Sequence, residues 1–133
     1  MKRSYTGGCH CGVVRYAVDL DLSQGTFRCN CSICSKGRAW LAGVPAGGFR
    51  LLQGEDALSK YQFNTHRIEH LFCSRCGIKS FAQNTNGQGE RMHVVVVNCL
   101  DGIEDAELAA LPVAYLDGRN DDFRSPPAET RHM

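Results

Sequence analysis

Three of the eight cysteines in this chain lie within six consecutive residues, in a C-x-C-x-x-C run formed by Cys29, Cys31 and Cys34. Such a run is strained as a disulfide because the loops that it would close are very short. Three thiolates that converge on one soft cation need only a tight turn, and zinc is the expected ion. We therefore interpret these three residues, called the claw below, as a metal site around which the chain folds.

Four more cysteines form two close pairs next to glycines, Cys9 with Cys11 and Cys73 with Cys76. Glycine permits the positive φ and the close backbone approach that a metal-binding turn requires. The seven clustered thiols divide naturally into one four-thiolate site and one three-thiolate site. Joining the two pairs gives a closed, structural zinc site. The claw then keeps a fourth tetrahedral position open to water, a substrate thiolate or another side chain.

Cys99 lies outside these groups and leaves an alternative open. As a fourth ligand, Cys99 would close the claw into a second structural site. Otherwise it would be a neighbour of the open site, a redox thiol or a buried small hydrophobe, and the last of these is the default for a single cysteine.

Charge and hydropathy exclude several classes of partner. Lysine and arginine total 15 residues against 14 aspartates and glutamates, so the net charge of +1 predicts no nucleic-acid or anionic membrane partner. No window approaches the roughly 18 apolar residues of a membrane span, and no apolar run follows the basic start of the chain as it would in a secretory signal. We therefore expect a cytoplasmic protein whose reduced thiols are held by metal.

Short segments with strand-like patterns recur along the chain, and turn residues separate them. The strongest is 92–97, where four consecutive valines predict a central strand that is buried on both faces. Residues 8–31 are expected to form one hairpin that carries the claw at its end, and 58–72 are expected to form another. Other predicted strands are 39–44, 49–52, 79–83 and 113–116. The pattern predicts a mostly β fold of small antiparallel sheets stapled by zinc.

Only residues 104–111 have a helical pattern, so we expect at most one short helix. The chain is long enough for one domain with its own core, and nothing in it suggests a second domain. Residues 1–133 are therefore interpreted as a single zinc domain with a core at about 5–120. The polar segment 117–133 is expected to be ordered only where it docks on the body.

The cysteines stand in longer motifs, which are Gly8-Cys9-His10-Cys11-Gly12, Cys29-Asn30-Cys31-Ser32-Ile33-Cys34 with Lys36, His70-Leu71-Phe72-Cys73-Ser74-Arg75-Cys76-Gly77 and Asn98-Cys99-Leu100-Asp101. Together, over about residues 5–120, they resemble the glutathione-dependent formaldehyde-activating (GFA) enzyme family. The resemblance implies a zinc β-tent fold and a carbon–sulfur lyase that joins formaldehyde and glutathione as S-(hydroxymethyl)glutathione. Carried over by motif, the structural zinc would be held by Cys9, Cys11, Cys73 and Cys76, and the catalytic zinc by Cys29, Cys31 and Cys34.

Several residues near the thiols are candidates for substrate contacts or proton transfer. Lys36 and Arg38 follow the claw and could receive the carboxylates of a glutathione-like substrate, although loop cations are usually just solvated. His70 could orient a thiolate or act as an acid or base. Trp40 is interpreted as a core residue and Asp101 as a helix cap, with pocket and catalytic roles as the alternatives.

The leading hypothesis is a zinc enzyme that acts on a thiol–aldehyde adduct, with two zinc ions as cofactors and a small thiol such as glutathione as partner. Cys29, Cys31 and Cys34 would be its catalytic residues. A second hypothesis is a non-catalytic zinc module that binds a protein partner. A third is a redox protein in which Cys31 and Cys34 form a reversible disulfide without metal.

Overall fold

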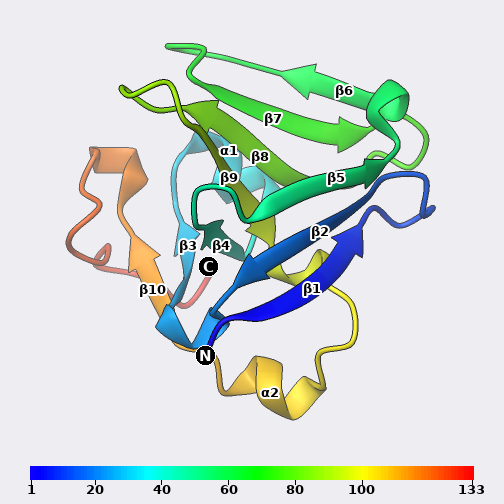
Figure 1. The fold of residues 1–133 in the computed structure, drawn as a ribbon. Coiled ribbons are helices and arrows are strands. Elements are labelled where there is room, and N and C mark those ends of the chain that lie inside the picture. The colour runs from blue at the N-terminus through cyan, green and yellow to red at the C-terminus, as the bar shows by residue number, and fades with distance from the viewer.

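Strands dominate the computed structural model, which describes residues 1–133 (Figure 1). The ten strands are β1 (Arg3–Gly8), β2 (Arg15–Leu20), β3 (Thr26–Cys29), β4 (Leu41–Val44), β5 (Phe49–Gln53), β6 (Leu58–Tyr61), β7 (Ile68–Cys73), β8 (Lys79–Thr85), β9 (Arg91–Val96) and β10 (Val113–Leu116). The prediction of a mostly β fold is confirmed.

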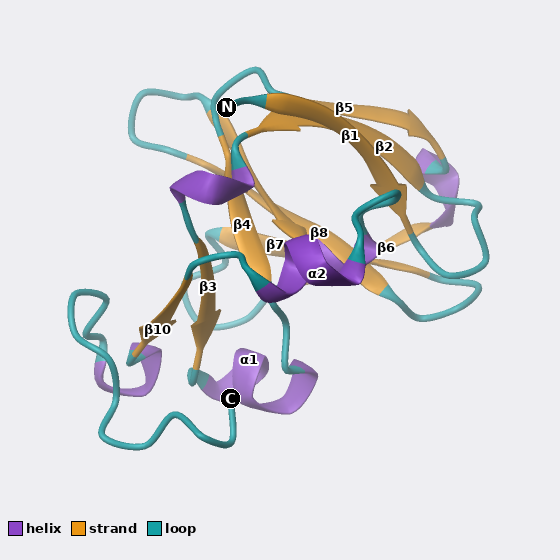
Figure 2. Cartoon of the chain, turned by 90° about the horizontal axis from the view of Figure 1, so that it is seen from below, coloured by secondary structure: helices purple, strands orange, loops and turns teal.

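The strands form two sheets, a three-stranded sheet in the order β1-β2-β5 and a seven-stranded sheet in the order β10-β3-β4-β9-β8-β7-β6. All neighbours are antiparallel except β10 and β3, which run parallel. Figure 2 shows the smaller sheet facing the β8 side of the larger one, whereas β3 and β10 extend beyond it. The claw, at the end of β3, therefore lies away from the smaller sheet.

The valine-rich strand β9 is central, as predicted, because it is fourth of seven in its sheet. Its burial is less complete than predicted. Val95 is fully buried, whereas Val94 and Val96 are half-buried on the other face. The prediction that this strand is buried on both faces is therefore wrong, because the smaller sheet covers only one side of the larger sheet.

An aromatic cluster fills the space between the sheets. The ring of Tyr16, on β2, lies 5.1 Å from that of Phe49 and 5.6 Å from that of Phe81, on β8. The buried Tyr16 hydroxyl donates a hydrogen bond of 2.9 Å to the carbonyl oxygen of Ser80. Each fully buried side chain of this size contributes about 1.5–3 kcal/mol. The cluster thus holds the two sheets in a fixed relation and positions the turns that carry the cysteines.

The predicted hairpin over residues 8–31 is wrong. Strand β2 pairs with β1 and β5, whereas β3 pairs with β4 and β10 in the other sheet. A short 3-10 turn, Leu22–Gln24, redirects the chain, with Asp21 accepting a hydrogen bond from the Ser23 N–H and Leu22 buried. The predicted hairpin over residues 58–72 is confirmed as β6 and β7.

Two short helices are present, α1 (Ser32–Gly37) and α2 (Asp105–Ala109), so the expectation of at most one helix is corrected. Helix α2 lies inside the predicted segment 104–111. Helix α1 was not predicted, because six residues are too few to show an apolar period. Neither helix has the length and apolar character needed to cross a membrane.

Asp101 does not cap α2, because the N-cap position is Glu104. The Asp101 carboxylate instead accepts a hydrogen bond of 2.8 Å from the Thr6 hydroxyl and pairs with the guanidinium of Arg15. These contacts connect β1 and β2 to the segment that follows β9. The interpretation of Asp101 as a helix cap is therefore wrong, and its role is to fasten the smaller sheet to the larger one.

Candidate metal centres and the cavities beside the claw

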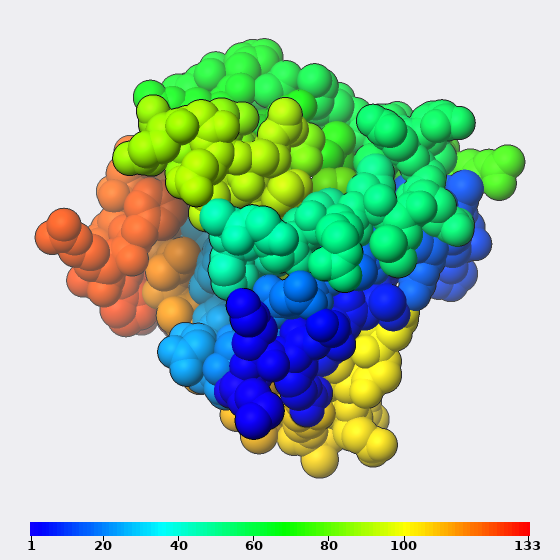
Figure 3. All heavy atoms as spheres, viewed as in Figure 1, coloured from blue at the N-terminus to red at the C-terminus, as the bar shows by residue number.

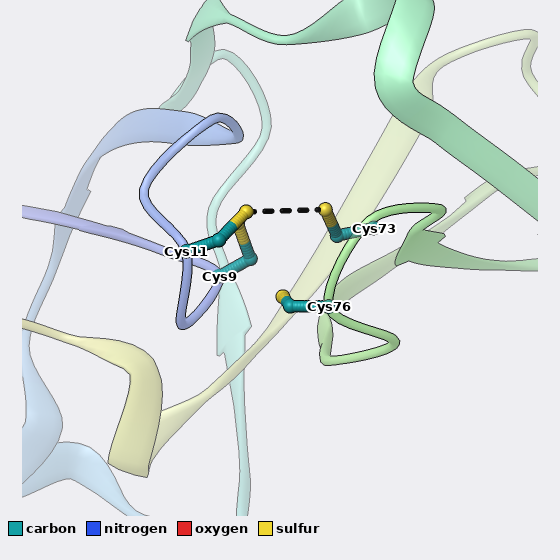
Figure 4. A group of neighbouring side chains, drawn as sticks. All are labelled: Cys9, Cys11, Cys73 and Cys76. Carbon is teal, nitrogen blue, oxygen red and sulfur yellow. Dashed lines mark hydrogen bonds between the residues drawn. The ribbon is translucent and has the colours of Figure 1, made fainter.

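Four cysteines from two distant segments converge on one point (Figure 4). Cys9 and Cys11 lie on the turn after β1, while Cys73 ends β7 and Cys76 lies in the turn before β8. The Sγ atoms of Cys9 and Cys11 are 3.6 Å apart, and those of Cys11 and Cys73 are 3.7 Å apart. A tetrahedral zinc with Zn–S bonds of about 2.3 Å separates its sulfurs by about 3.8 Å. These residues, called the four-cysteine site below, fit such an ion.

The turn that carries Cys9 and Cys11 depends on glycine, as predicted. Gly12 has φ of 86°, a conformation that other residues rarely adopt. A Cβ atom at Gly8 would lie 1.9 Å from the Val14 carbonyl oxygen, so no side chain fits there. The sequence therefore permits a turn tight enough to bring both sulfurs to one side.

Backbone N–H groups point at the sulfurs of the four-cysteine site. The Val14 N–H donates to Cys9 Sγ at 3.3 Å, and the Arg75 N–H donates to Cys73 Sγ at 3.4 Å. Backbone N–H groups, first that of the facing Cys9–Cys11 turn, lower the pKa of Cys76 to about 6. Such donors stabilise thiolates, the form that binds metal.

The claw is assembled by one short segment. Cys29 ends β3, Cys31 occupies the N-cap position of α1, and Cys34 lies inside α1. All three Sγ atoms lie within 4.8 Å of one another, and all three side chains are half-buried. Burial, and then the neighbouring Cys31 sulfur, raises the pKa of Cys34 to about 12. A bound cation would offset this crowding of thiolates, so the claw also fits a metal ion.

Cys99 joins neither sulfur group. It lies in a short 3-10 turn, Val97–Cys99, directly after β9, and it is half-buried. Burial raises its pKa to about 11, and the charges of Cys9 and Cys76 add to the effect. The structure therefore gives the claw three cysteines rather than four, which does not support closure by Cys99.

The C-terminal segment 117–133 docks against the claw. The side chain of Asn30, only 5% exposed, donates to Asp117 at 2.9 Å and accepts from the Arg119 N–H at 3.0 Å. A Cβ atom at Gly118 would lie 2.5 Å from Cys29 Sγ, so this backbone packs directly on the sulfur. Figure 2 shows the C-terminus ending beside α1, and Figure 3 shows the segment on the flank of the molecule.

A cavity of about 210 Å³ lies between this segment and the claw, and we call it the arginine cavity. Its lining includes Cys29 and Cys34 together with Arg28, Arg38 and Arg119. None of the three arginines forms an ion pair with a carboxylate. The arginine cavity is therefore a positively charged space beside two claw sulfurs.

The three guanidinium groups of the arginine cavity are held by neutral contacts. Arg28 stacks over the ring of Trp40 at 5.0 Å, and Arg119 donates to the Ser35 hydroxyl at 3.1 Å. Arg38 donates to the carbonyl oxygen of His132 in the C-terminal segment. Of the two cations predicted after the claw, Arg38 thus faces a cavity. The other, Lys36, is exposed on α1 and lines neither of the cavities that Cys34 lines.

Cys34 also lines a second cavity of about 440 Å³, which we call the lysine cavity because Lys79 lines it too. The Lys79 Nζ lies 2.7 Å from Nδ1 of His70, which is 7% exposed. Burial, and then the charge of Lys79, lowers the pKa of His70 to about 4. The hydrogen bond of His70 is therefore to Lys79 and not to a cysteine, so the predicted role in orienting a thiolate is not supported.

Trp40 is a core residue, as predicted, because it is only 8% exposed and its Nε1 donates to the Thr26 hydroxyl at 2.7 Å. Sequence reasoning missed Arg28, Arg119 and Lys79. Arg28 directly precedes Cys29 in the sequence, and Lys79 is the one charged residue of its strand. Those two positions carried a usable signal, whereas nothing in the sequence brings Arg119 to the claw.

Comparisons with known proteins agree with this geometry. Residues 4–115 match the family described as "Glutathione-dependent formaldehyde-activating enzyme". The fold is also similar to the crystal structure of a Rhodobacter sphaeroides protein, with a TM-score of 0.68 and 31% sequence identity, over 82% of this chain and 99% of that chain. Both cysteine groups lie inside the matched residues, whereas the whole C-terminal segment 117–133 lies outside them.

Proposed function

Since the chain belongs to the glutathione-dependent formaldehyde-activating enzyme family, we propose that it is a zinc-dependent carbon–sulfur lyase acting on a thiol–aldehyde adduct. Its reaction would be of the type that joins glutathione and formaldehyde as S-(hydroxymethyl)glutathione. The claw carries this proposal, because three thiols converge on one point without a fourth, and two cavities border it. Zinc held there would lower the pKa of a substrate thiol and keep the thiolate nucleophilic.

The arginine cavity supports an acidic thiol as the substrate. Glutathione carries two carboxylates, and a guanidinium group binds a carboxylate through two parallel hydrogen bonds. Arg28, Arg38 and Arg119 have no carboxylate partner of their own. A bound thiol would replace the His132 carbonyl as the acceptor for Arg38, and its sulfur would approach the claw at Cys29 and Cys34.

Two observations favour this enzyme over the other hypotheses. A zinc module that binds a protein partner needs no cavity at its metal, whereas Cys34 lines two cavities. A redox disulfide between Cys31 and Cys34 would leave Cys29 without a role, whereas all three sulfurs converge on one point. The four-cysteine site would hold a structural zinc, since four thiols complete a tetrahedral ion and join two distant segments.

The proposal is tested by the exchange rate between free formaldehyde and its glutathione adduct, measured by exchange NMR with protein that carries both metals. The expected result is an exchange rate that rises in proportion to protein concentration above the uncatalysed rate. Cys31→Ser should abolish this increase while the protein stays folded. Exchange at the buffer rate across a panel of thiols and aldehydes would contradict the proposal.

A further inference from the structure

Lys79 is the only one of the four lysines that is not exposed to solvent. It belongs to none of the seven ion pairs of the structure. Its one hydrogen-bond partner is Nδ1 of His70, at 2.7 Å. Burial lowers the pKa of Lys79, while the charges of the claw sulfurs Cys34 and Cys31 act in the opposite direction. Lys79 therefore lies within electrostatic reach of the claw.

His70 fixes the direction of the Lys79 side chain. Its ring lies on β7, stacks against Phe63 with centroids 5.5 Å apart and is nearly fully buried. A buried neutral imidazole with its proton on Nε2 accepts a hydrogen bond at Nδ1. The lysine ammonium therefore donates one proton to His70 and keeps two for other acceptors.

Lys79 and Cys34 both line the lysine cavity. The side chains of Ile33, Trp40 and Val96 give this cavity apolar walls. Apolar walls suit a small neutral molecule. Arg38 lines both cavities, but its guanidinium donates to the His132 carbonyl oxygen, whereas Arg28 and Arg119 line the arginine cavity alone. The claw thus separates a space suited to an acidic thiol from a space suited to an uncharged carbonyl compound.

We propose that the lysine cavity is the aldehyde site and that Lys79 is a catalytic residue that donates a proton to the aldehyde oxygen, with His70 as its positioning residue. This assignment rests on the proposed function. The thiolate lone pair forms the new C–S bond, the C=O π electrons move to oxygen, and the Lys79 ammonium protonates that oxygen. The proton lost when the thiol becomes a thiolate enters water, and Lys79 recovers one proton from water, so the step balances.

The kinetic test compares Lys79→Met with Lys60→Met. Lys60 is an exposed lysine on β6 that lines neither cavity beside the claw. A general acid contributes about 100-fold or more, so Lys79→Met should lower kcat/KM by about that factor while zinc content is unchanged. Lys60→Met should stay within about twofold of wild type. His70→Leu should lower kcat/KM by about tenfold, whereas His70→Gln, which still accepts a hydrogen bond, should restore most of it.

A second test does not depend on turnover. The full chain is treated with formaldehyde and cyanoborohydride, and methylation of each lysine is followed by peptide mass spectrometry with and without S-methylglutathione. Lys79 should be methylated despite its burial. The S-methyl group of S-methylglutathione would take the place of the adduct carbon in the lysine cavity, so saturating S-methylglutathione should slow this methylation at least about fivefold without protecting Lys60. Absence of turnover in the wild-type protein would overturn the proposed function and this assignment together. Turnover that Lys79→Met leaves within twofold, or Lys79 methylation that S-methylglutathione does not slow, would overturn the Lys79 assignment alone.

Discussion

The two cysteine sites are built in opposite ways. In the four-cysteine site, sulfurs 62 residues apart along the chain lie 3.7 Å from each other, and Cys73 is fully buried. The claw draws its sulfurs from one six-residue segment, and all three are half-buried beside cavities. Cross-linking a loop of that length restricts the unfolded chain by about 4 kcal/mol, whereas the claw closes almost no loop. Ligands from distant segments therefore suit a structural metal site, whereas ligands from one short segment suit a site that binds substrate.

The largest expected effect is the difference between Cys73→Ser and Cys31→Ser. Structural zinc contributes on the order of 10 kcal/mol of apparent folding free energy, more than a domain of this size can lose. Cys73→Ser should therefore unfold or aggregate. Cys31→Ser should stay folded and lose one of two zinc ions. Circular dichroism and metal analysis of both variants check this. Equal loss of folded structure in the two variants would contradict the division into a structural and an open site.

A chelator should remove zinc from the two sites at different rates. The claw offers an ion three thiols from one short segment, whereas the other site offers four thiols from two segments, so a chelator should remove one zinc per chain at least about tenfold faster than the other. The near- and far-ultraviolet circular dichroism should change only with the slow phase. Release followed with a zinc-sensitive dye measures both phases. A single phase of zinc release that coincides with unfolding would show that the claw metal is also required for the folded state.

Arg38→Ala should weaken thiol binding at the claw without affecting the four-cysteine site. Loss of one guanidinium–carboxylate contact of about 1.4 kcal/mol should raise the KM for glutathione about tenfold. The KM for 2-mercaptoethanol, which has no carboxylate, should change by less than about twofold. Arg67→Ala, at an exposed arginine without an ion pair, is the matched control. An equal rise in KM for both thiols would contradict a role in carboxylate recognition.

The smallest expected effect is a pH dependence of stability that comes from His70 rather than from metal loss. The pKa of His70 is about 4 in the folded protein, lowered by burial and then by Lys79, against an ordinary value of 6.5. The unfolded chain therefore binds the proton first, and stability falls as the pH drops from 6.5 towards 4. Between pH 7.5 and 5.5 the loss should be about 1.4 kcal/mol, and His70→Gln should abolish it.

Denaturant unfolding of wild type and His70→Gln at the two pH values measures this difference. Proton-linked release of zinc affects both proteins alike, because the substitution keeps all seven clustered cysteines. Identical pH dependence in the two proteins would mean that His70 titrates near its ordinary pKa. That result would also remove the basis for a neutral His70 that accepts a hydrogen bond from Lys79.

The cysteine groups could be predicted from the sequence because metal ligands follow short, local spacing rules. Cys29, Cys31 and Cys34 stand close together in any fold, and the count of thiols alone pairs Cys9 with Cys73. The central position of the strand at 92–97 was also predictable, since consecutive valines favour an extended, buried backbone.

The remaining features depend on contacts between distant segments. Local alternation indicates strands within 8–31 but not the strands with which they pair, so the predicted hairpin over 8–31 was wrong. The pairing of β7 with β8 brings His70 and Lys79 together, and docking of the C-terminal segment brings Arg119 to the claw. None of these contacts leaves a periodic pattern in the sequence.

Zinc-edge X-ray absorption spectroscopy tests most directly whether one site is closed and the other open. Seven clustered thiols shared by two ions predict an average of about 3.5 sulfur ligands per zinc, with the remainder supplied by oxygen or nitrogen. Addition of glutathione should raise the average to about 4 sulfur ligands per zinc. A single zinc per chain, or about 4 sulfur ligands per zinc before any thiol is added, would contradict an open claw.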